Sequence, residues 1–228
     1  MNLTANEIAK MMDLSCVQAF STLDEIKFAA ETAIKYNCIC VIALPAHTPY
    51  LIGLLKDYPA VLVGGTVGFP DGGATTEGKV LETKELKNMG VNEIDMVINL
   101  GWLKAGNYDE VRNDIESVVA AAGDLPVKVI LECQYLTDAE IVKACQIAAS
   151  CSVEFVKTGT GWAPTGATLD NIKLMSEAVG GRCKVKAAGG IRDLGTLLSM
   201  YKIGATRFGV GAKSAEAILE DSVVRDPR

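Results

Sequence analysis

The chain has 228 residues, of which 49% are hydrophobic, and this proportion is enough for a sizeable core. Its 22 basic and 28 acidic residues give a net charge of −6, and no basic run indicates a nucleic-acid partner. The first residues lack the pattern of a signal peptide, and no apolar run reaches the length of a membrane span. Seven cysteines without a C-x-x-C pair agree with free thiols in a reducing compartment. We therefore expect a cytoplasmic protein with no membrane partner.

Short apolar stretches alternate with amphipathic stretches along the whole chain, which predicts parallel strands joined by helices. The expected strands are Met11–Val17, Cys38–Leu44, Val61–Val67, Glu93–Asn99, Val127–Cys133, Glu154–Thr158, Lys184–Ala188 and Thr206–Val210. The expected helices are Leu23–Tyr36, Pro49–Lys56, Thr75–Met89, Asp109–Ala122, Asp138–Ala149, Leu169–Val179, Leu194–Ile203 and Ala215–Ser222. No linker or repeat interrupts this pattern, so we expect a single domain over residues 1–228.

Eight strand–helix units within this length predict an α/β protein with the TIM (β/α)8 barrel fold. A doubly wound open sheet is the alternative, but it calls for a G-x-G-x-x-G turn after the first strand, and none follows Met11–Val17. The catalytic groups of TIM barrels lie at the carboxyl ends of the strands. The residues near those ends include Asp95, Glu132, Lys157 and Lys186.

Lys157 stands where a short apolar strand becomes a glycine-rich loop. A buried lysine is costly unless it is paired or neutral, and a neutral amine can form a Schiff base. The common alternative is a lysine whose stem runs along the strand end and whose ammonium reaches water. Lys186 repeats the pattern before a Gly-Gly turn, and two neighbouring lysines lower each other's pKa. The pair therefore favours Schiff-base chemistry.

Asp95 lies between Ile94 and Met96, which indicates burial on a central strand. Its carboxylate would orient Lys186 and serve in a proton relay, and it could equally be only the structural partner of a core lysine. In this chemistry Lys157 attacks a carbonyl, the protonated imine withdraws electrons, and a C–C bond forms or breaks through an enamine. No metal or other cofactor is required. The single histidine, His47, lies in a turn-like stretch, so a zinc site is poorly supplied.

Glycine clusters follow the last three expected strands and would lie on one rim of the barrel. The loops after strands seven and eight of such barrels often bind phosphate through backbone amides. Two basic residues, Arg192 and Lys213, are placed to add positive charge. The glycines are Gly159, Gly161, Gly189, Gly190, Gly209 and Gly211.

Five motifs together resemble the signatures of the deoxyribose-phosphate aldolase family, and the match runs in order over nearly the whole chain. They are Val-Lys-Thr-Gly-Thr-Gly161, Val-Lys-Ala-Ala-Gly-Gly-Ile-Arg192, Glu-Ile-Asp-Met-Val-Ile-Asn99, Gly-Phe-Pro70 and Lys-Val-Ile-Leu-Glu-Cys133. The resemblance implies a TIM-barrel class I aldolase that interconverts 2-deoxyribose 5-phosphate with glyceraldehyde 3-phosphate and acetaldehyde. It also implies a homodimer or larger homo-oligomer.

The resemblance assigns roles to individual residues. Lys157 resembles the Schiff-base lysine, Lys186 the second lysine that tunes it, and Asp95 the relay carboxylate. Asp13 corresponds to the aspartate of the Asp-His-Thr motif in the first strand, and Cys40 to a cysteine near the end of strand two. The expected substrate-binding residues are Asp13, Cys40, Thr158, Thr160, Gly161, Gly189, Gly190, Arg192, Gly209, Gly211 and Lys213.

The sequence departs from the family pattern around the expected phosphate site. The family's His-Thr pair is Leu14-Ser15 here, and Gly209-Val-Gly-Ala-Lys213 lacks the two serines of the usual Gly-Thr-Ser-Ser-Gly loop. Gly159 replaces a serine, Trp162 follows it, and the tail from Asp221 to Arg228 has no tyrosine. A different or unphosphorylated aldehyde is therefore an alternative substrate. A catalytically inactive sugar-phosphate-binding barrel is a third hypothesis, but it gains nothing from three buried charges.

Overall fold

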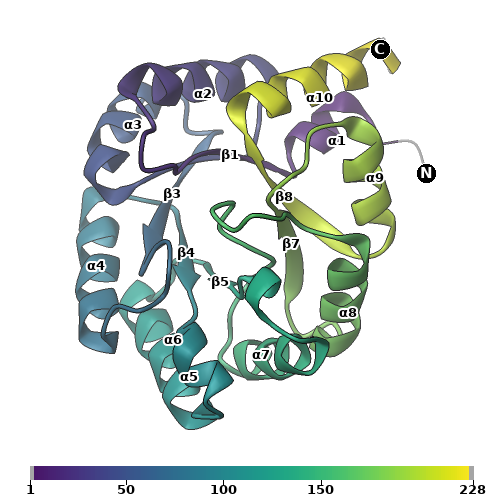
Figure 1. Ribbon diagram of the computed structural model, residues 1–228. Coiled ribbons are helices and arrows are strands. Elements are labelled where there is room, and N and C mark those ends of the chain that lie inside the picture. The colour runs from purple at the N-terminus through teal and green to yellow at the C-terminus, as the bar shows by residue number, and fades with distance from the viewer. Residues whose placement is uncertain (1–2, 226–228) are drawn as a thin grey trace.

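The computed structural model describes residues 3–225, so both ends of the expected domain 1–228 and the last residues of the tail lie outside it. Within residues 3–225, eight parallel strands close into a barrel in chain order, with β8 pairing back to β1 (Figure 1). The strands are β1 (Met12–Cys16), β2 (Cys40–Ala43), β3 (Leu62–Val67), β4 (Glu93–Val97), β5 (Val127–Ile130), β6 (Phe155–Lys157), β7 (Lys184–Ala188) and β8 (Ala205–Gly211). The predicted TIM barrel is confirmed.

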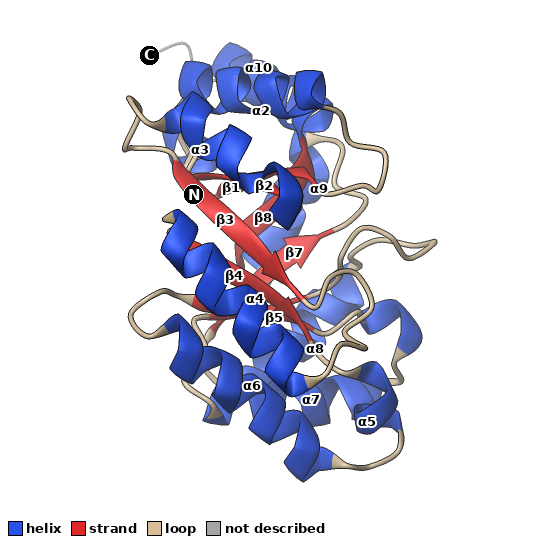
Figure 2. Ribbon diagram, turned by 90° about the vertical axis from the view of Figure 1, so that its left-hand side faces the viewer, coloured by secondary structure: helices blue, strands red, loops and turns tan. Residues whose placement is uncertain are grey.

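The helices surround this barrel and cover its strands on the outside (Figure 2). They are α1 (Ala5–Ala9), α2 (Leu23–Tyr36), α3 (Thr48–Leu55), α4 (Thr76–Met89), α5 (Leu100–Lys104), α6 (Tyr108–Ala122), α7 (Asp138–Ser150), α8 (Leu169–Val179), α9 (Leu194–Lys202) and α10 (Ala212–Arg225), with the 3-10 turns η1 (Pro45–His47) and η2 (Cys133–Tyr135). Among residues 3–225, none of the helices combines the length and the apolar character that crossing a bilayer requires.

Local signals explain where several helices begin. Thr22 and Thr137 each accept a backbone hydrogen bond from a glutamate three residues later, and that glutamate bonds back to the threonine amide. These capping boxes satisfy amides that the first turn leaves without partners, so α2 and α7 begin where the sequence predicts. The short helices α1 and α5 were not predicted, because five residues give too little periodicity to recognise.

Successive side chains along each strand alternate between the core that packs against the helices and the interior of the barrel. In β1, Met12 and Leu14 are fully buried in the core that packs against the helices, whereas Asp13 pairs with charged residues of other strands inside the barrel. The register then aligns the charged side chains: Asp95 is opposite Lys128, and Lys157 is opposite Lys186. The fold thus gathers in one place the polar strand residues that the sequence analysis singled out.

Candidate active site

The interior of the barrel contains a network of seven charged side chains joined by ion pairs. None is more than 7% exposed. The residues are Asp13, Glu93, Asp95, Lys128, Lys157, Lys186 and Arg207. Burial of so many charges is tolerated because each has at least one partner of opposite sign.

Asp95 lies at the centre of one set of ion pairs in this network, which extends towards the carboxyl ends of the strands. Its Oδ2 atom lies 2.8 Å from Lys157 Nζ and 2.7 Å from Lys186 Nζ, and its Oδ1 atom lies 2.9 Å from Lys128 Nζ. Burial alone would raise the pKa of Asp95, but Lys128, Lys157 and Lys186 outweigh it and hold that pKa well below its usual range. Asp95 therefore stays ionised and bridges the two lysines that the sequence predicts to act together.

A second set of ion pairs lies towards the amino ends of the strands. Arg207 bonds Asp13 through Nε, and its Nη2 atom lies 2.9 Å from Glu93 Oε1. Asp13 Oδ2 also lies 2.5 Å from Lys186 Nζ, which links this set to the one around Asp95. Burial raises the pKa of Asp13, but Lys186, Arg207 and Lys128 together hold it below its usual value. Through Asp13, this second set therefore holds the ammonium of Lys186 from the amino-terminal side of the barrel.

The pKa of Lys157 is lowered to about 8. Burial is the largest cause, Asp95 opposes it, and the positive charge of Lys186 adds to it. The network has four basic side chains and three carboxylates, so one positive charge lacks a partner when all are ionised. Lys157 is the amine of this network that opens to the pocket described below. With a pKa of about 8, about a tenth of the Lys157 amine is uncharged at pH 7.

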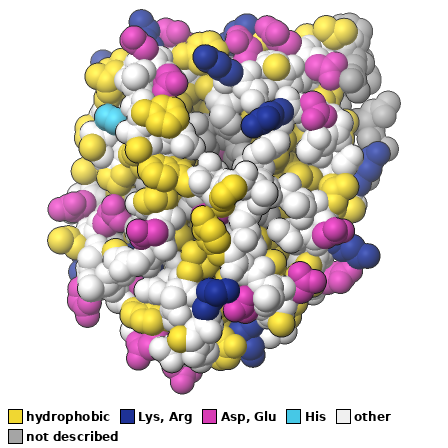
Figure 3. All heavy atoms as spheres, in the orientation of Figure 1, with side chains coloured by type: hydrophobic (Ala, Val, Ile, Leu, Met, Phe, Trp, Pro, Cys, Tyr) yellow, Lys and Arg dark blue, Asp and Glu magenta, His cyan; other side chains and the backbone are white. Residues whose placement is uncertain are grey.

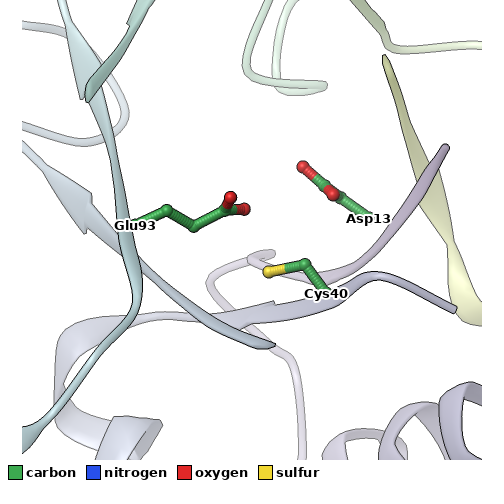
Figure 4. Close-up of side chains that lie close together, drawn as sticks. All are labelled: Asp13, Cys40 and Glu93. Atoms are coloured by element: carbon green, nitrogen blue, oxygen red, sulfur yellow. The ribbon is translucent and has the colours of Figure 1, made fainter. Parts of the chain in front are cut away.

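Asp13, Cys40 and Glu93 point towards one another from β1, β2 and β4 (Figure 4), and their ligand atoms lie within 4.8 Å of each other. This set does not suit a metal ion. Arg207 bonds both carboxylates and Lys128 bonds Glu93, so basic side chains already occupy the carboxylate oxygens. Burial also raises the pKa of the Cys40 thiol well above its usual value, which keeps it protonated.

Lys157 lines a pocket of about 200 Å³ at the carboxyl ends of the strands. Its floor and walls come from the strand ends and the loops that follow β1, β6, β7 and β8. The lining residues are Ser15, Val17, Gln18, Lys157, Thr160, Gly161, Ala188, Gly189, Gly190, Ile191, Gly209, Val210 and Gly211. Figure 3 shows hydrophobic side chains gathered near the middle of the face that Figure 1 presents.

The loop between β6 and α8 crosses the open end of the barrel (Figure 1). Trp162 Nε1 donates a hydrogen bond of 2.8 Å to Val17 O, and the indole ring meets Phe69 edge-on at 6.1 Å. Gln18 Nε2 also donates to Gly161 O, at 3.3 Å. The loop after β6 is thereby tied to the loops after β1 and β3, above the amine of Lys157.

Glu132 holds the same loop from the opposite side. Its carboxylate accepts hydrogen bonds from the backbone amide and the hydroxyl of Thr160, and burial raises its pKa. The backbone of Glu132 has a φ of 52°, which is uncommon for a residue with a side chain. A Cβ on Gly159 would lie 2.6 Å from Glu132 Oε1, so a side chain at this position would displace the carboxylate that holds Thr160.

The structure brings together most of the predicted glycines and Thr160. Gly161, Gly189, Gly190, Gly209, Gly211 and Thr160 line the pocket of Lys157. Thr158 does not: its hydroxyl donates to Ala188 O and accepts from Ala188 N, both at 2.9 Å, so it ties β6 to β7. Arg192 is exposed outside this pocket, and Lys213 lines a neighbouring one.

The predicted places of Cys40 and Asp13 need correction. Cys40 is the first residue of β2 and not near its end, and Ile42, two residues later on the same face, is closer to the rim. Asp13 lies beneath Lys186 within the ion-pair network. Neither residue is among those that line the pocket of Lys157. Both belong to the layer that supports the two lysines, away from the place where a substrate would enter.

Lys128, Glu93 and Arg207 were missed as members of the site. Lys128 stands between Val127 and Val129 on a buried strand, which is the same signal that identified Lys157. Arg207 precedes Phe208 on β8 and is buried. A charged residue on an expected inner strand was therefore an available signal for each of these three residues, but not for the way they pair inside the barrel.

The comparisons agree with this geometry. A family model described as DeoC/LacD family aldolase matches residues 8–214. A curated deoxyribose-phosphate aldolase from Klebsiella pneumoniae subsp. pneumoniae is 44% identical over 97% of this chain and 90% of that protein. A solved structure of a putative deoxyribose-phosphate aldolase from Coccidioides immitis has a TM-score of 0.91 and 32% identity, covering 97% of this chain and 88% of that one.

A deoxyribose phosphate aldolase from Aeropyrum pernix, described as tetrameric, shares the fold with a TM-score of 0.88 and 24% identity, covering 100% of this chain and 95% of that one. The sequence match over most of the chain and the closed barrel lead to one conclusion. The chain belongs to the DeoC/LacD family of aldolases.

Proposed function

We propose that the protein is a class I aldolase that cleaves 2-deoxy-D-ribose 5-phosphate reversibly to glyceraldehyde 3-phosphate and acetaldehyde. The observation that carries this proposal is the pair of lysines on one carboxylate oxygen, with only Lys157 opening to the pocket. The relatives described as deoxyribose-phosphate aldolases support the substrate. No cofactor takes part, because Lys157 itself supplies the covalent group.

The uncharged amine of Lys157 attacks the aldehyde carbon of the open-chain sugar, and loss of water gives a protonated imine. A base removes the proton of the C3 hydroxyl, the C2–C3 bond breaks, and its electron pair flows into the imine to form an enamine. Glyceraldehyde 3-phosphate leaves, the enamine takes up a proton, and water hydrolyses the resulting imine to acetaldehyde and free Lys157. Asp95 and Lys186 are the groups placed to relay these protons.

The expected phosphate contacts are backbone amides of the rim glycines. Gly189 and Gly190 have φ of 94° and 75°, a left-handed conformation that favours glycine, and both line the pocket of Lys157. Gly209 is required by packing, because an added Cβ would lie 2.9 Å from the Cβ of Ala188. Gly189 and Gly190, in the loop after β7, are therefore the backbone positions that support anion binding without the serines of the family loop.

Borohydride reduction in the presence of acetaldehyde tests the covalent step. We expect a stable adduct on Lys157, located by peptide mass spectrometry, and its loss in Lys157→Met. Lys184→Met is a matched control, because Lys184 is exposed and bonded to Glu154 at the start of β7. Folded protein that carries no label on Lys157 would refute the proposal.

A second candidate function is a class I aldolase for an unphosphorylated aldehyde. The observation that favours it is the wall of the pocket, where Arg192 does not reach the cavity and Gly211 has no hydroxyl. Turnover of glyceraldehyde and glyceraldehyde 3-phosphate as acceptors separates the two. Equal kcat/KM for both would favour the second candidate, and a preference of tenfold or more for the phosphorylated acceptor would favour the first.

We also propose that the protein acts in the cytoplasm as a homo-oligomer. Its seven cysteines, all within the described residues, are free thiols, which suits a reducing compartment. Exposed apolar side chains on the helices, such as Tyr108 and Val224, offer surface for association. Sedimentation of the purified chain tests this assembly, and a single species at 24.1 kDa would contradict it.

A further inference from the structure

A second pocket adjoins the pocket of Lys157 and shares the wall residues Ser15, Gln18 and Gly211 with it. It lies where the loop after β1, the helix α2 and the start of α10 meet. The two pockets have volumes of about 220 and 200 Å³. Neither alone reaches the size usual for a small-molecule site, roughly 300–1,000 Å³, but the two together do. The shared residues make the two pockets neighbours, and a ligand that spans both would occupy a site of this size.

Two aromatic rings give the second pocket its character. Phe28 of α2 lines it and is half-buried, and Phe20 lines it although 76% of Phe20 is exposed. A phenylalanine this exposed leaves most of its ring in water, and contact with an apolar group removes that ring surface from water. The remaining lining residues are Cys16, Ser21, Glu25, Ala212, Lys213 and Ser214.

The charges of this pocket argue against a phosphate as its occupant. Lys213 could attract an anion, but Glu25 lines the same pocket and repels one. Gly211, which also lines the pocket of Lys157, and Ala212 beside it carry no hydroxyl that could bind a phosphate. An uncharged apolar group meets no such opposition, and it would gain contact with Phe20 and Phe28.

We propose that this second pocket is an acceptor subsite for unphosphorylated aldehydes that carry a hydrocarbon or aromatic extension. The proposal rests on the aldolase function proposed above. In the addition direction, the enamine of acetaldehyde on Lys157 attacks the acceptor carbonyl carbon. The new C–C bond forms, the carbonyl π electrons move to oxygen, which takes up a proton, and water hydrolyses the imine to release the product.

The kinetic test compares 3-phenylpropanal with acetaldehyde as acceptor. Ser214→Leu narrows the pocket, and we expect it to lower kcat/KM for 3-phenylpropanal about tenfold with little change for acetaldehyde. Ser199→Leu, on the exposed side of α9, is its matched control. Phe20→Ser should lower the same value at least threefold, whereas Leu81→Ser, a 59% exposed leucine on α4, should leave it unchanged.

A binding test does not depend on catalysis. Titration calorimetry with 3-phenylpropan-1-ol, which cannot form an imine, should give a dissociation constant that Ser214→Leu raises about tenfold and Ser199→Leu leaves unchanged. If the alcohol binds in this way while borohydride traps no aldehyde, the pocket stands and the proposed aldolase function falls.

Three results would overturn the subsite. The alcohol could fail to bind, or bind all variants equally. Ser214→Leu and Lys213→Met could instead lower kcat/KM for glyceraldehyde 3-phosphate, which would make the pocket a phosphate site. Phe20→Ser could change the sedimentation coefficient and leave acceptor preference intact, which would make Phe20 part of a contact between copies of the chain.

Discussion

Lys157 and Lys128 are both buried lysines in contact with Asp95, yet their pKa values move in opposite directions. Burial lowers both, but Asp95, Glu93 and Asp13 together raise the pKa of Lys128 above its usual value, whereas that of Lys157 falls to about 8. The number of carboxylates around each amine decides the direction. One lysine is thus kept as a permanent cation, and the other is available as a nucleophile.

The lowered pKa of Lys157 predicts that kcat/KM depends on pH. The uncharged amine is the reactive form, so kcat/KM should rise about tenfold per pH unit below pH 8 and level off above it. Lys186→Met removes a positive neighbour and frees Asp95 for Lys157, and both changes raise the pKa of Lys157. We therefore expect the midpoint of the profile to move to higher pH. In Lys184→Met the midpoint should stay in place, and a shift there would contradict the assignment.

Gly211 permits a direct test of the altered phosphate loop. A Cβ at this position meets no atom within 4 Å, so a serine fits without strain. We expect Gly211→Ser to raise kcat/KM for glyceraldehyde 3-phosphate relative to glyceraldehyde, because a hydroxyl can donate to the phosphate. Gly209→Ser is the contrasting variant, since its Cβ would press on Ala188 and impair both acceptors equally. No change in the ratio for Gly211→Ser would place the phosphate elsewhere.

Among the elements, α4 and α6 are joined by a buried ion pair that lies outside the barrel. Lys79 Nζ lies 2.6 Å from Asp114 Oδ2 and 2.9 Å from Val97 O, and both side chains are fully buried. Thr76 adds a hydrogen bond of 2.9 Å to Asp114. This pair connects the two helices to the end of β4, two residues beyond Asp95.

Asp114→Leu leaves the ammonium of Lys79 buried without a carboxylate, and we expect it to lower the free energy of unfolding by about 3–5 kcal/mol. The double variant Lys79→Met/Asp114→Leu should recover at least half of that loss, as measured by urea denaturation. Glu31→Gln is the control, because the Lys27–Glu31 pair is exposed and 3.9 Å apart. A double variant as unstable as the single one would contradict this account.

Sequence patterns predicted the elements better than the positions within them. All eight strands and the helices α2 and α8 were located, because alternation and capping residues are local signals. Cys40 was placed too close to the rim, since the period of two fixes which face a residue occupies but not its height along the barrel. Arg192 was assigned to the site from its loop, although a sequence does not show where a long exposed side chain points.

At the scale of the whole molecule, the barrel is closed by contacts between its two ends in sequence. β1 pairs with β8, and Arg207 of β8 bonds Asp13 of β1 and Glu93 of β4. Pairing between strands so far apart in the sequence could not be read from local patterns. For the same reason the full charge network was not predicted. The count of eight units predicted closure, whereas the pairing of the enclosed charges became apparent only in three dimensions.

A chain that ends at Lys202 lacks β8 and α10, so it leaves Asp13 and Glu93 without Arg207 and exposes two strand edges. We expect this fragment to keep helical far-ultraviolet circular dichroism but to lose its near-ultraviolet signal and its cooperative unfolding transition. The full chain measured in parallel is the reference. A fragment that unfolds as sharply as the full chain would show that closure is not needed for stable packing.

The sequence separation of 194 positions between Asp13 and Arg207 also sets an order of events during synthesis. On the ribosome, the first strand is made long before its partner, so the nascent chain keeps an open strand edge, and Asp13 lacks Arg207, until the eighth strand leaves the exit tunnel. Chaperones therefore have nearly the whole period of translation in which to engage it. Ribosome-bound chains stalled before residue 205 should stay sensitive to protease, and chains released at full length should become resistant.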